Sequence, residues 1–377
     1  MAKKESRDER AERIAAMCAV INKSTFGGEN KDAVTWLGSR DQIDIERFPS
    51  GDPGLDDALG GGWPKARQIE VFGPESGGKT TLTLHALAEH QKKYEDEDCA
   101  LIDTEFTFDE AYAKKLGVNP KYLIVHQPDS GEQALNILKM LIQNGVKFII
   151  VDSVAALTTK HELEGDIGDT MVGEQARLMS GALKQLTSEA GKRGVTIFWT
   201  NQMRDKIGVM YGDKTTTPAG RALKHYASIR CHIRAIGKVK EKVKGEDVIV
   251  SSQNKVDVKK NKTAPPFRTA EFCISFGHGI DGIAGVLDMA IAMKLLEKRG
   301  AWFNFDGQQL GQGRANTLDL MRSDKELTKK ISDKIAEAKA SGVKAEVASD
   351  VEVLDPNAGS DPDALGSPEE GASVEDV

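Results

Sequence analysis

Residues 73–80 read Gly-Pro-Glu-Ser-Gly-Gly-Lys-Thr, which matches the pattern G-x-x-x-x-G-K-[ST] at every fixed position. The pattern has the flanks that it requires, because Gln68–Phe72 predicts a strand before it and Lys79–Lys93 predicts an amphipathic helix after it. In such a loop, glycines allow backbone N–H groups to surround phosphate oxygens, and the helix N-terminus adds a favourable dipole. The predicted contacts to the nucleotide are Gly73, Pro74, Glu75, Ser76, Gly77, Gly78, Lys79, Thr80 and Thr81.

Outward from this loop, predicted strands and helices alternate. The next strands are Cys99–Thr104, Lys147–Val151 and Val195–Thr200, and the helices are Gly131–Asn144 and Glu174–Ala190. Strands this short and apolar are expected where helices cover both faces of a sheet. The alternation predicts an α/β fold with a mainly parallel sheet.

The two ends of the chain follow other patterns. Beyond Lys224, strands are predicted directly after one another, and a small helical region follows. These segments are Ser228–Ile236, Val248–Val258 and Ala270–Phe276 for strands, and Gly285–Arg299 and Asp324–Ala338 for helices. Residues 5–23 predict a helix, because Ala11, Ile14, Cys18 and Ile21 form an apolar stripe. From Thr25 to about Gly54 the chain is rich in Gly, Asp and Asn, which predicts a linker.

Two acids stand where phosphate chemistry needs them, after predicted strands. Asp152 follows an apolar run and is the expected carboxylate of a Mg²⁺ shell that the Thr80 hydroxyl joins, while Lys79 reaches the β- and γ-phosphates. Glu105 also follows a strand and is the candidate base that orients the attacking water. A surface acid at a strand end is the alternative for Glu105, since Asp103 is close by.

Composition excludes several classes of protein. No stretch reaches the 18 or so apolar residues of a membrane span, and the charged N-terminus is not a signal peptide. The four cysteines include no CxxC pair, which excludes a zinc ribbon and favours a reducing cytoplasm. From Glu346 to Val377 there are ten Asp and Glu residues and no Lys or Arg, so removing these charges from the net −7 leaves +3 for residues 1–345. A mildly basic body with an acidic tail suits a polyanionic partner, although a tail that only maintains solubility explains the charge equally well.

Seven segments in this order closely resemble the bacterial RecA family: GPESGGKTTLTLHALA, LIDTEFTFDEAYAKKLGV, QPDSGEQAL, IIVDSVAALT, EGDIGDTMVGEQARLMS, NQMRDKIGVMYG and ALKHYASIR. The resemblance runs from roughly Asp44 to Ala338. It implies a RecA-type P-loop core that binds ATP with Mg²⁺, and Glu105 as the catalytic glutamate. Departures at Val172, Pro218-Ala219 and His225 from the usual bacterial pattern fit a divergent or phage-encoded member.

The resemblance also implies roles that spacing alone does not indicate. Asp109, Tyr112 and Pro266 resemble the family's adenine contacts, and Gln202 resembles the switch that couples ATP to DNA. Lys260 and Lys262 resemble the pair that reaches the ATP of the neighbouring subunit; taken alone, they read as a solvated basic surface. Two segments, about 164–173 and 203–221, resemble the DNA-binding loops. Their implied contacts are Gly165, Val172, Gly173, Arg177, Ser180, Met203, Arg204, Lys206, Ile207, Gly208, Val209, Met210, Gly220 and Arg221.

The implied layout has four parts: a polymerisation helix and linker (1–43), the ATPase core (44–280), a small C-terminal α/β domain (281–344) and a disordered acidic tail (345–377). The implied function is a recombinase that forms helical filaments on single-stranded DNA and exchanges strands with duplex DNA, with single-strand binding and mediator proteins as further partners. A ring-forming motor such as a replicative helicase is one rival. A DNA-binding protein with a vestigial P-loop is another, against which the intact set Lys79, Thr80, Glu105 and Asp152 argues.

Overall fold

The computed structural model describes residues 6–26, 34, 36, 45–166, 173–205, 215–218, 220–243 and 246–343. The chain divides into two compact units, Met1–Glu46 and Arg47–Val377. In the first, the predicted N-terminal helix is confirmed as α1 (Arg7–Phe26). The Asn22 side chain donates to the carbonyl of Val34 at 2.9 Å and accepts from its N–H at 2.8 Å, which ties the chain after α1 back to the helix.

In the second unit, nine strands of the described residues form one sheet in the order β13-β12-β11-β10-β3-β7-β6-β4-β5. Six neighbouring strands are parallel: β10, β3, β7, β6, β4 and β5. Strands β11, β12 and β13 continue the sheet beyond β10 as antiparallel strands. Their bounds are β3 (Gln68–Gly73), β4 (Cys99–Asp103), β5 (Leu123–His126), β6 (Phe148–Asp152), β7 (Thr196–Gln202), β10 (Ile229–Val243), β11 (Glu246–Asn261), β12 (Thr269–Ser275) and β13 (Gly279–Ile280). The predicted α/β fold with a mainly parallel sheet is therefore confirmed.

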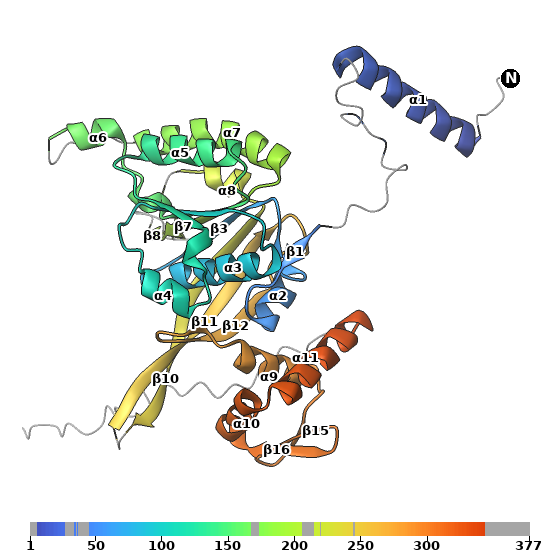
Figure 1. Cartoon of the computed structure of the whole chain (residues 1–377), viewed down its shortest axis with the longest axis vertical. Helices are drawn as coiled ribbons and strands as arrows, with labels where there is room; N and C mark the ends of the chain where they lie inside the picture. Colours follow the sequence, from blue (N-terminus) through green and yellow to red (C-terminus); the bar gives the residue numbers. More distant parts are fainter. Residues whose placement is uncertain are drawn as a thin grey trace, which may run out of the picture. The chain divides into compact units, whose positions relative to one another are not determined.

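Helices cover both faces of the parallel strands, and this explains why these strands are mostly apolar. Figure 1 shows α3 (Lys79–Lys93) on one side of the sheet and α5 (Gly131–Gln143) and α7 (Glu174–Arg193) on the other. Alternate residues of β6 divide between the two cores: Phe148 and Ile150 join the α3 side, and Ile149 and Val151 join the α5 and α7 side.

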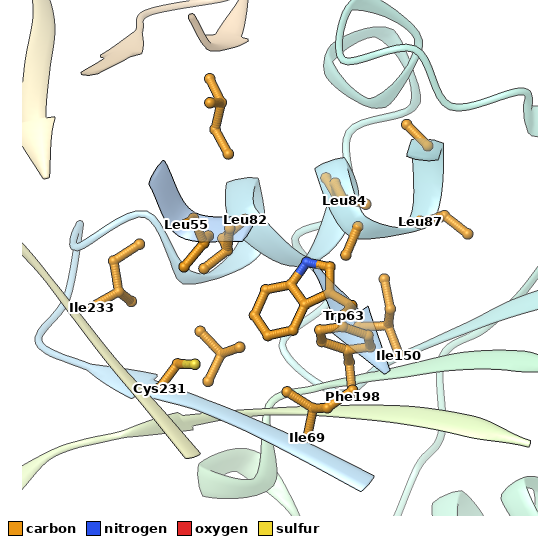
Figure 2. Close-up of a cluster of buried hydrophobic side chains, with 14 of the residues drawn as sticks. Leu55, Trp63, Ile69, Leu82, Leu84, Leu87, Ile150, Phe198, Cys231 and Ile233 are labelled. Carbon is orange, nitrogen blue, oxygen red and sulfur yellow. The ribbon is translucent and has the colours of Figure 1, made fainter. Parts of the chain in front are cut away.

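The segment before the phosphate loop is part of the core, so the predicted linker is wrong from Arg47 onward. There β1 (Arg47–Phe48) pairs with β2 (Trp63–Pro64), and α2 (Pro53–Leu59) lies between them in the chain. Figure 2 shows the Trp63 ring among apolar side chains of α2, α3 and the sheet. Trp63 contacts Phe198 edge-on, with 5.1 Å between ring centroids. Elements this short give no detectable periodicity, and tertiary packing stabilises them.

The C-terminal region is a small α/β unit with its own core. Its elements are α9 (Gly282–Ala292), β14 (Glu297–Arg299), β15 (Trp302–Phe305), β16 (Gln308–Gln312), α10 (Gly313–Ser323) and α11 (Lys325–Ala340). The predicted helix Gly285–Arg299 is wrong at its end, because residues 297–299 pair with β15. The three-stranded sheet was missed because each strand is too short to alternate visibly.

The hairpin of β10 and β11 is longer than predicted on both strands. Their pairing continues to Val243 and Glu246, whereas β12 pairs with β11 only between Ser251 and Asp257. The distal half of the hairpin therefore extends past β12 as a two-stranded ribbon (Figure 1). Across the described ranges, no helix has the length and apolarity to span a membrane.

Candidate functional site

The predicted site residues lie along one edge of the sheet, because parallel strands end together. The phosphate loop follows β3, Glu105 follows β4, Asp152 ends β6 and Gln202 ends β7. These strands are neighbours in the order β3-β7-β6-β4. The fold therefore gathers side chains that are far apart in the sequence.

Two glycines of the phosphate loop are required because neighbouring strands approach closely. A Cβ atom on Gly73 would lie 2.0 Å from the carbonyl oxygen of Ile233 on β10. Gly78 has φ +90°, and a Cβ atom there would lie 2.7 Å from Ile274 Cδ1. The backbone of β10 and a side chain of β12 thus confine the loop on one side, and α3 begins at its end, where the first N–H groups of a helix have no partner within the helix.

Lys79 is half-buried and lies against the loop, with Nζ donating to the Pro74 carbonyl at 2.8 Å. Burial lowers the pKa of Lys79, while the carboxylates of Asp152, Glu105 and Glu75 act in the opposite direction. A cation that is partly desolvated at the end of a phosphate-type loop interacts strongly with an anion, because screening by water is reduced.

The two predicted Mg²⁺ ligands are in direct contact. Thr80 Oγ1 donates to Asp152 Oδ2 at 2.7 Å, and the Thr200 hydroxyl donates to the other carboxylate oxygen. Burial raises the pKa of Asp152, and these two hydroxyl donors lower it in part. A hydroxyl and a carboxylate fit Mg²⁺, which takes oxygen ligands and often uses only one or two from the protein besides phosphate and water.

Glu105 is exposed just beyond the end of β4 and has two partners. Its Oε1 atom accepts from the Ser153 hydroxyl and from Gln202 Nε2, the latter at 3.4 Å. Both partners come from neighbouring strand ends, so the carboxylate is directed along the same edge as Asp152. This geometry suits a group that orients water beside a phosphate.

Asp103, the alternative to Glu105, has a structural position. Its side chain is 2% exposed. The carboxylate accepts from the backbone N–H groups of Thr107 and Phe108, at 3.3 and 3.1 Å, and from Gln127 Nε2 at 2.9 Å. These contacts order the turn that carries Glu105 and leave Asp103 away from solvent.

The predicted adenine contacts are only partly brought together. Asp109 caps α4 (Glu110–Lys115) by accepting from the Tyr112 N–H at 3.0 Å. The Tyr112 hydroxyl hydrogen-bonds to Thr81 Oγ1 at 2.9 Å, which fastens the ring to α3. Pro266 lies elsewhere, exposed on the connection between β11 and β12.

Lys260 and Lys262 lie at the end of β11 and hold a helix terminus. Lys260 Nζ donates to the carbonyls of Lys224 and His225 at 2.7 and 3.0 Å, and Lys262 Nζ donates to His225 at 3.4 Å. These carbonyls belong to α8 (Ala222–Tyr226), and cations are favourable at a helix C-terminus. Burial lowers the pKa of Lys260, with smaller contributions from Lys262 and Arg230.

The first predicted DNA-binding loop connects α6 (Lys160–Glu164) to α7. Of its predicted contacts the structure describes Gly165, Gly173, Arg177 and Ser180, while Val172 lies outside the described residues. Gly165 caps the end of α6, and Gly173, at φ +83°, begins α7. Arg177 is exposed one turn later. The base of this loop is held by Gln175, whose Nε2 donates to the Val154 carbonyl at 2.9 Å.

The second predicted DNA-binding loop begins directly after Gln202. Met203 is half-buried, and then β8 (Arg204–Asp205) pairs with β9 (Thr215–Thr216). Gly220 and the exposed Arg221 lead into α8. The predicted contacts Lys206, Ile207, Gly208, Val209 and Met210 lie outside the described residues, and only the backbone of Arg204 is described.

Sequence reasoning missed several residues that support the site. Ser153 and Thr200 orient the two carboxylates, and their positions beside a predicted strand end were the available signal. Glu70, fully buried in β3, accepts from Arg230 on β10, and a glutamate within an apolar strand was the signal there. Asn254 of β11 donates to the Gly77 carbonyl at 3.0 Å, and no local pattern indicates this contact.

Two family models match the chain: the RecA N-terminal domain over residues 13–281 and the RecA C-terminal domain over residues 284–340. The chain is 48% identical over 332 residues to Protein RecA of Rickettsia prowazekii (strain Madrid E), an alignment that covers 88% of this chain and 94% of the relative. It is 50% identical over 304 residues to Protein RecA of Nitrobacter winogradskyi, covering 80% of this chain and 82% of the relative.

Proposed function

The chain belongs to the RecA family and is a DNA-dependent ATPase of DNA recombination and repair; from this premise we propose that it binds ATP with Mg²⁺, forms a helical filament on single-stranded DNA and pairs this strand with homologous duplex. The observation that carries the proposal is the convergence of Lys79, Asp152 and Glu105 at one sheet edge, with Thr80 bonded to Asp152. Phosphoryl transfer needs mainly positioned charge, and this edge supplies it.

Each group has a distinct proposed role. Lys79 and the backbone N–H groups of the loop neutralise the phosphates, and Thr80 and Asp152 would hold the cation. Glu105 orients the attacking water, since its carboxylate is exposed and held by Ser153. Asp109 and Tyr112 receive the adenine, and Pro266 is a further proposed contact of the nucleotide.

The positions of Lys260 and Lys262 support action on a neighbouring subunit's nucleotide. Asn254 is the residue of β11 that contacts the phosphate loop of the same chain. Lys260 lies six residues further along this strand, which is roughly 20 Å at the usual rise per residue. That separation exceeds the reach of a lysine side chain, so these lysines are proposed to stabilise phosphate charge across a subunit interface.

An exposed apolar edge supports self-association. Within the described residues, β5 is the last strand at one edge of the sheet. Its residues Ile124 and Val125 are exposed by 46% and 42%. Met140 of α5 is also largely exposed. An open strand edge with apolar side chains favours pairing with another chain. Helix α1, with Met17 and Val20 exposed, is the proposed polymerisation element, and repeated head-to-tail contact gives an open helix.

The remaining assignments are proposed on the same premise. The predicted DNA contacts that the structure describes, from Gly165 to Arg221, are proposed to bind the DNA backbone. Residues 206–210 are proposed to complete the second loop. The parts 1–43, 44–280, 281–344 and 345–377 act as polymerisation segment, ATPase core, C-terminal domain and acidic tail. A cytoplasmic location is proposed because all four cysteines are free thiols.

The test of the proposed function removes the phosphate-binding ammonium group. Lys79→Ala should lose nucleotide binding and ATP-dependent filaments, seen by electron microscopy as open helices in the wild type. Lys92→Ala is the matched control, because Lys92 lies on the same helix, is exposed and forms an ion pair with Glu89. Strand exchange by Lys79→Ala at the wild-type rate would refute the assignment, and closed hexamers in the wild type would favour a ring-forming motor.

A further inference from the structure

Asn254 makes a buried contact with the phosphate loop from a distant strand. Its side chain is 0% exposed, and Nδ2 donates to the Gly77 carbonyl at 3.0 Å. On the other side, Asn254 Oδ1 accepts from the Ser252 hydroxyl at 2.7 Å. A carbonyl oxygen only accepts, so the amide nitrogen must face Gly77. The orientation of the amide is therefore determined by its two partners.

We propose that Asn254 is a positioning residue of the nucleotide site, which holds the Gly77–Gly78 peptide so that the Gly78 N–H faces the phosphates. This inference rests on the proposed function of the loop. Asn254 contacts the backbone of the loop, and in the proposed arrangement it acts through that backbone.

The argument follows from the planarity of the peptide unit. The C=O of one residue and the N–H of the next belong to one rigid plane and point in opposite directions when the bond is trans. Asn254 draws the Gly77 carbonyl toward β11. The Gly78 N–H of the same unit then points away from β11, toward the interior of the loop, where a phosphate oxygen accepts it.

Without this hydrogen bond the peptide has a second orientation available. Both residues are glycines, so rotation of the peptide plane meets little resistance from side chains. The surroundings prevent the whole loop from shifting instead, because Ile233 and Ile274 already pack against Gly73 and Gly78. In a rotated peptide, the carbonyl oxygen of Gly77 would face the phosphates and repel them.

The test compares two asparagines of the same strand. Asn254→Ala removes the donor, and Asn254→Asp places an acceptor against the Gly77 carbonyl. Asn261→Ala is the matched control, because Asn261 is also buried on β11 and its Nδ2 also donates to a backbone carbonyl, that of Leu59, at 3.0 Å. Binding of a fluorescent ATP analogue to the DNA-free protein should be about 10-fold to 100-fold weaker in both Asn254 variants. This is the loss expected when the hydrogen bond from the Gly78 N–H to a charged phosphate is removed.

The control separates positioning from general strand integrity. Asn261→Ala should lower the unfolding temperature at least as much as Asn254→Ala, because Asn261 Oδ1 also accepts from Thr263 and Ala264, and it should leave affinity for the analogue unchanged. Equal loss of affinity in the two alanine variants would overturn the inference, as would wild-type affinity in Asn254→Ala. If Asn254→Ala binds normally while Lys79→Ala does not, only this inference fails; if Lys79→Ala also binds normally, the proposed function fails.

The wild-type protein provides a measurement that does not depend on a variant folding. Gly78 is one of four glycines that directly follow a glycine, the others being Gly28, Gly61 and Gly62. Labelling glycine with carbonyl ¹³C and amide ¹⁵N therefore isolates four amide signals. Addition of ADP should shift one of them strongly downfield, as expected for an N–H that donates to phosphate. If all four signals keep their positions at saturating ADP, the inference is wrong.

Discussion

Gln202 Nε2 lies 3.4 Å from Glu105 Oε1 and donates a hydrogen bond to it, although 97 positions separate the two residues in the chain. Glu105 follows β4 beside the phosphate loop, and Gln202 is the last residue of β7 before the second predicted DNA-binding loop. We expect a change in the position of the carboxylate to reach the start of that loop through this contact. The contact is therefore our proposed route between nucleotide state and DNA binding.

The first prediction separates ATP binding from hydrolysis. Glu105→Gln keeps the size of the side chain and removes the carboxylate that we propose orients the attacking water. We expect near-normal ATP binding, stable filaments and turnover slower by roughly two orders of magnitude or more, as for loss of a general base. Steady-state ATPase assays with single-stranded DNA measure this. Unchanged turnover would assign the role to another group. Asp103→Asn, by contrast, should mainly lower the unfolding temperature, since Asp103 is buried and orders a turn.

The second prediction concerns action across the subunit interface. Changing Lys260 and Lys262 together to Ala should abolish DNA-stimulated ATP hydrolysis, because the cations would no longer reach the neighbouring nucleotide. ATP binding by isolated subunits should survive. Lys259→Ala is a suitable control, since Lys259 is on the same strand and pairs with Asp257 at 3.4 Å. Loss of nucleotide binding by the monomeric double variant would instead place the lysines in the site of their own chain.

The third prediction concerns pH and a buried histidine. His85 Nε2 accepts from the Ile280 N–H at 2.7 Å, which links α3 to β13. Burial, with a smaller contribution from Lys92, lowers the pKa of His85 from 6.5 to about 4. As pH falls, the unfolded chain therefore binds the proton first. The contribution of neutral His85 to the free energy of unfolding is complete above about pH 6.5 and is lost progressively toward pH 4. This loss reaches about 2 kcal/mol near pH 5.

Urea unfolding at about pH 7.5 and about pH 5 measures this effect against His85→Gln, whose amide does not titrate. The wild type should lose about 2 kcal/mol more than the variant between the two conditions. Asp52 works in the opposite direction, because burial raises its pKa to about 7 and the folded state gains a proton as pH falls. Asp52 is present in both proteins, so its contribution cancels in the comparison. Equal pH dependence of the two proteins would exclude His85 as the titrating group.

The fourth prediction concerns the acidic tail, which lies outside the described residues and is argued from charge alone. Ten carboxylates would compete with DNA phosphates for the lysines and arginines of a body that carries +3. Truncation after Ala345 should raise affinity for duplex DNA and lower the Mg²⁺ needed for strand exchange. The difference should shrink as salt rises, because screening weakens the attraction. Matching titrations of labelled duplex at low and high salt would support a tail that serves only solubility.

Much of the nucleotide site could be predicted because its signals are local. Glycine spacing identifies the phosphate loop, and apolar runs that end in an acid identify Asp152 and Glu105. The same reasoning missed β5 and the C-terminal sheet, whose strands of three to five residues are half-exposed or polar. Each of these strands is too short for its periodicity to be detected, so the sequence pattern alone does not separate it from a loop.

The amino-acid sequence by itself determined which residues can bind a nucleotide and that they stand after strands, since backbone periodicity and glycine spacing are properties of neighbouring positions. Only the tertiary structure decided which distant side chains hold these nucleotide-binding residues in place. Asn254 reaches Gly77 across 177 positions, and Arg230 reaches Glu70 across 160. These contacts depend on the strand order β11-β10-β3-β7, which is selected by the packing of whole elements around two cores and leaves no mark on the local pattern of either residue.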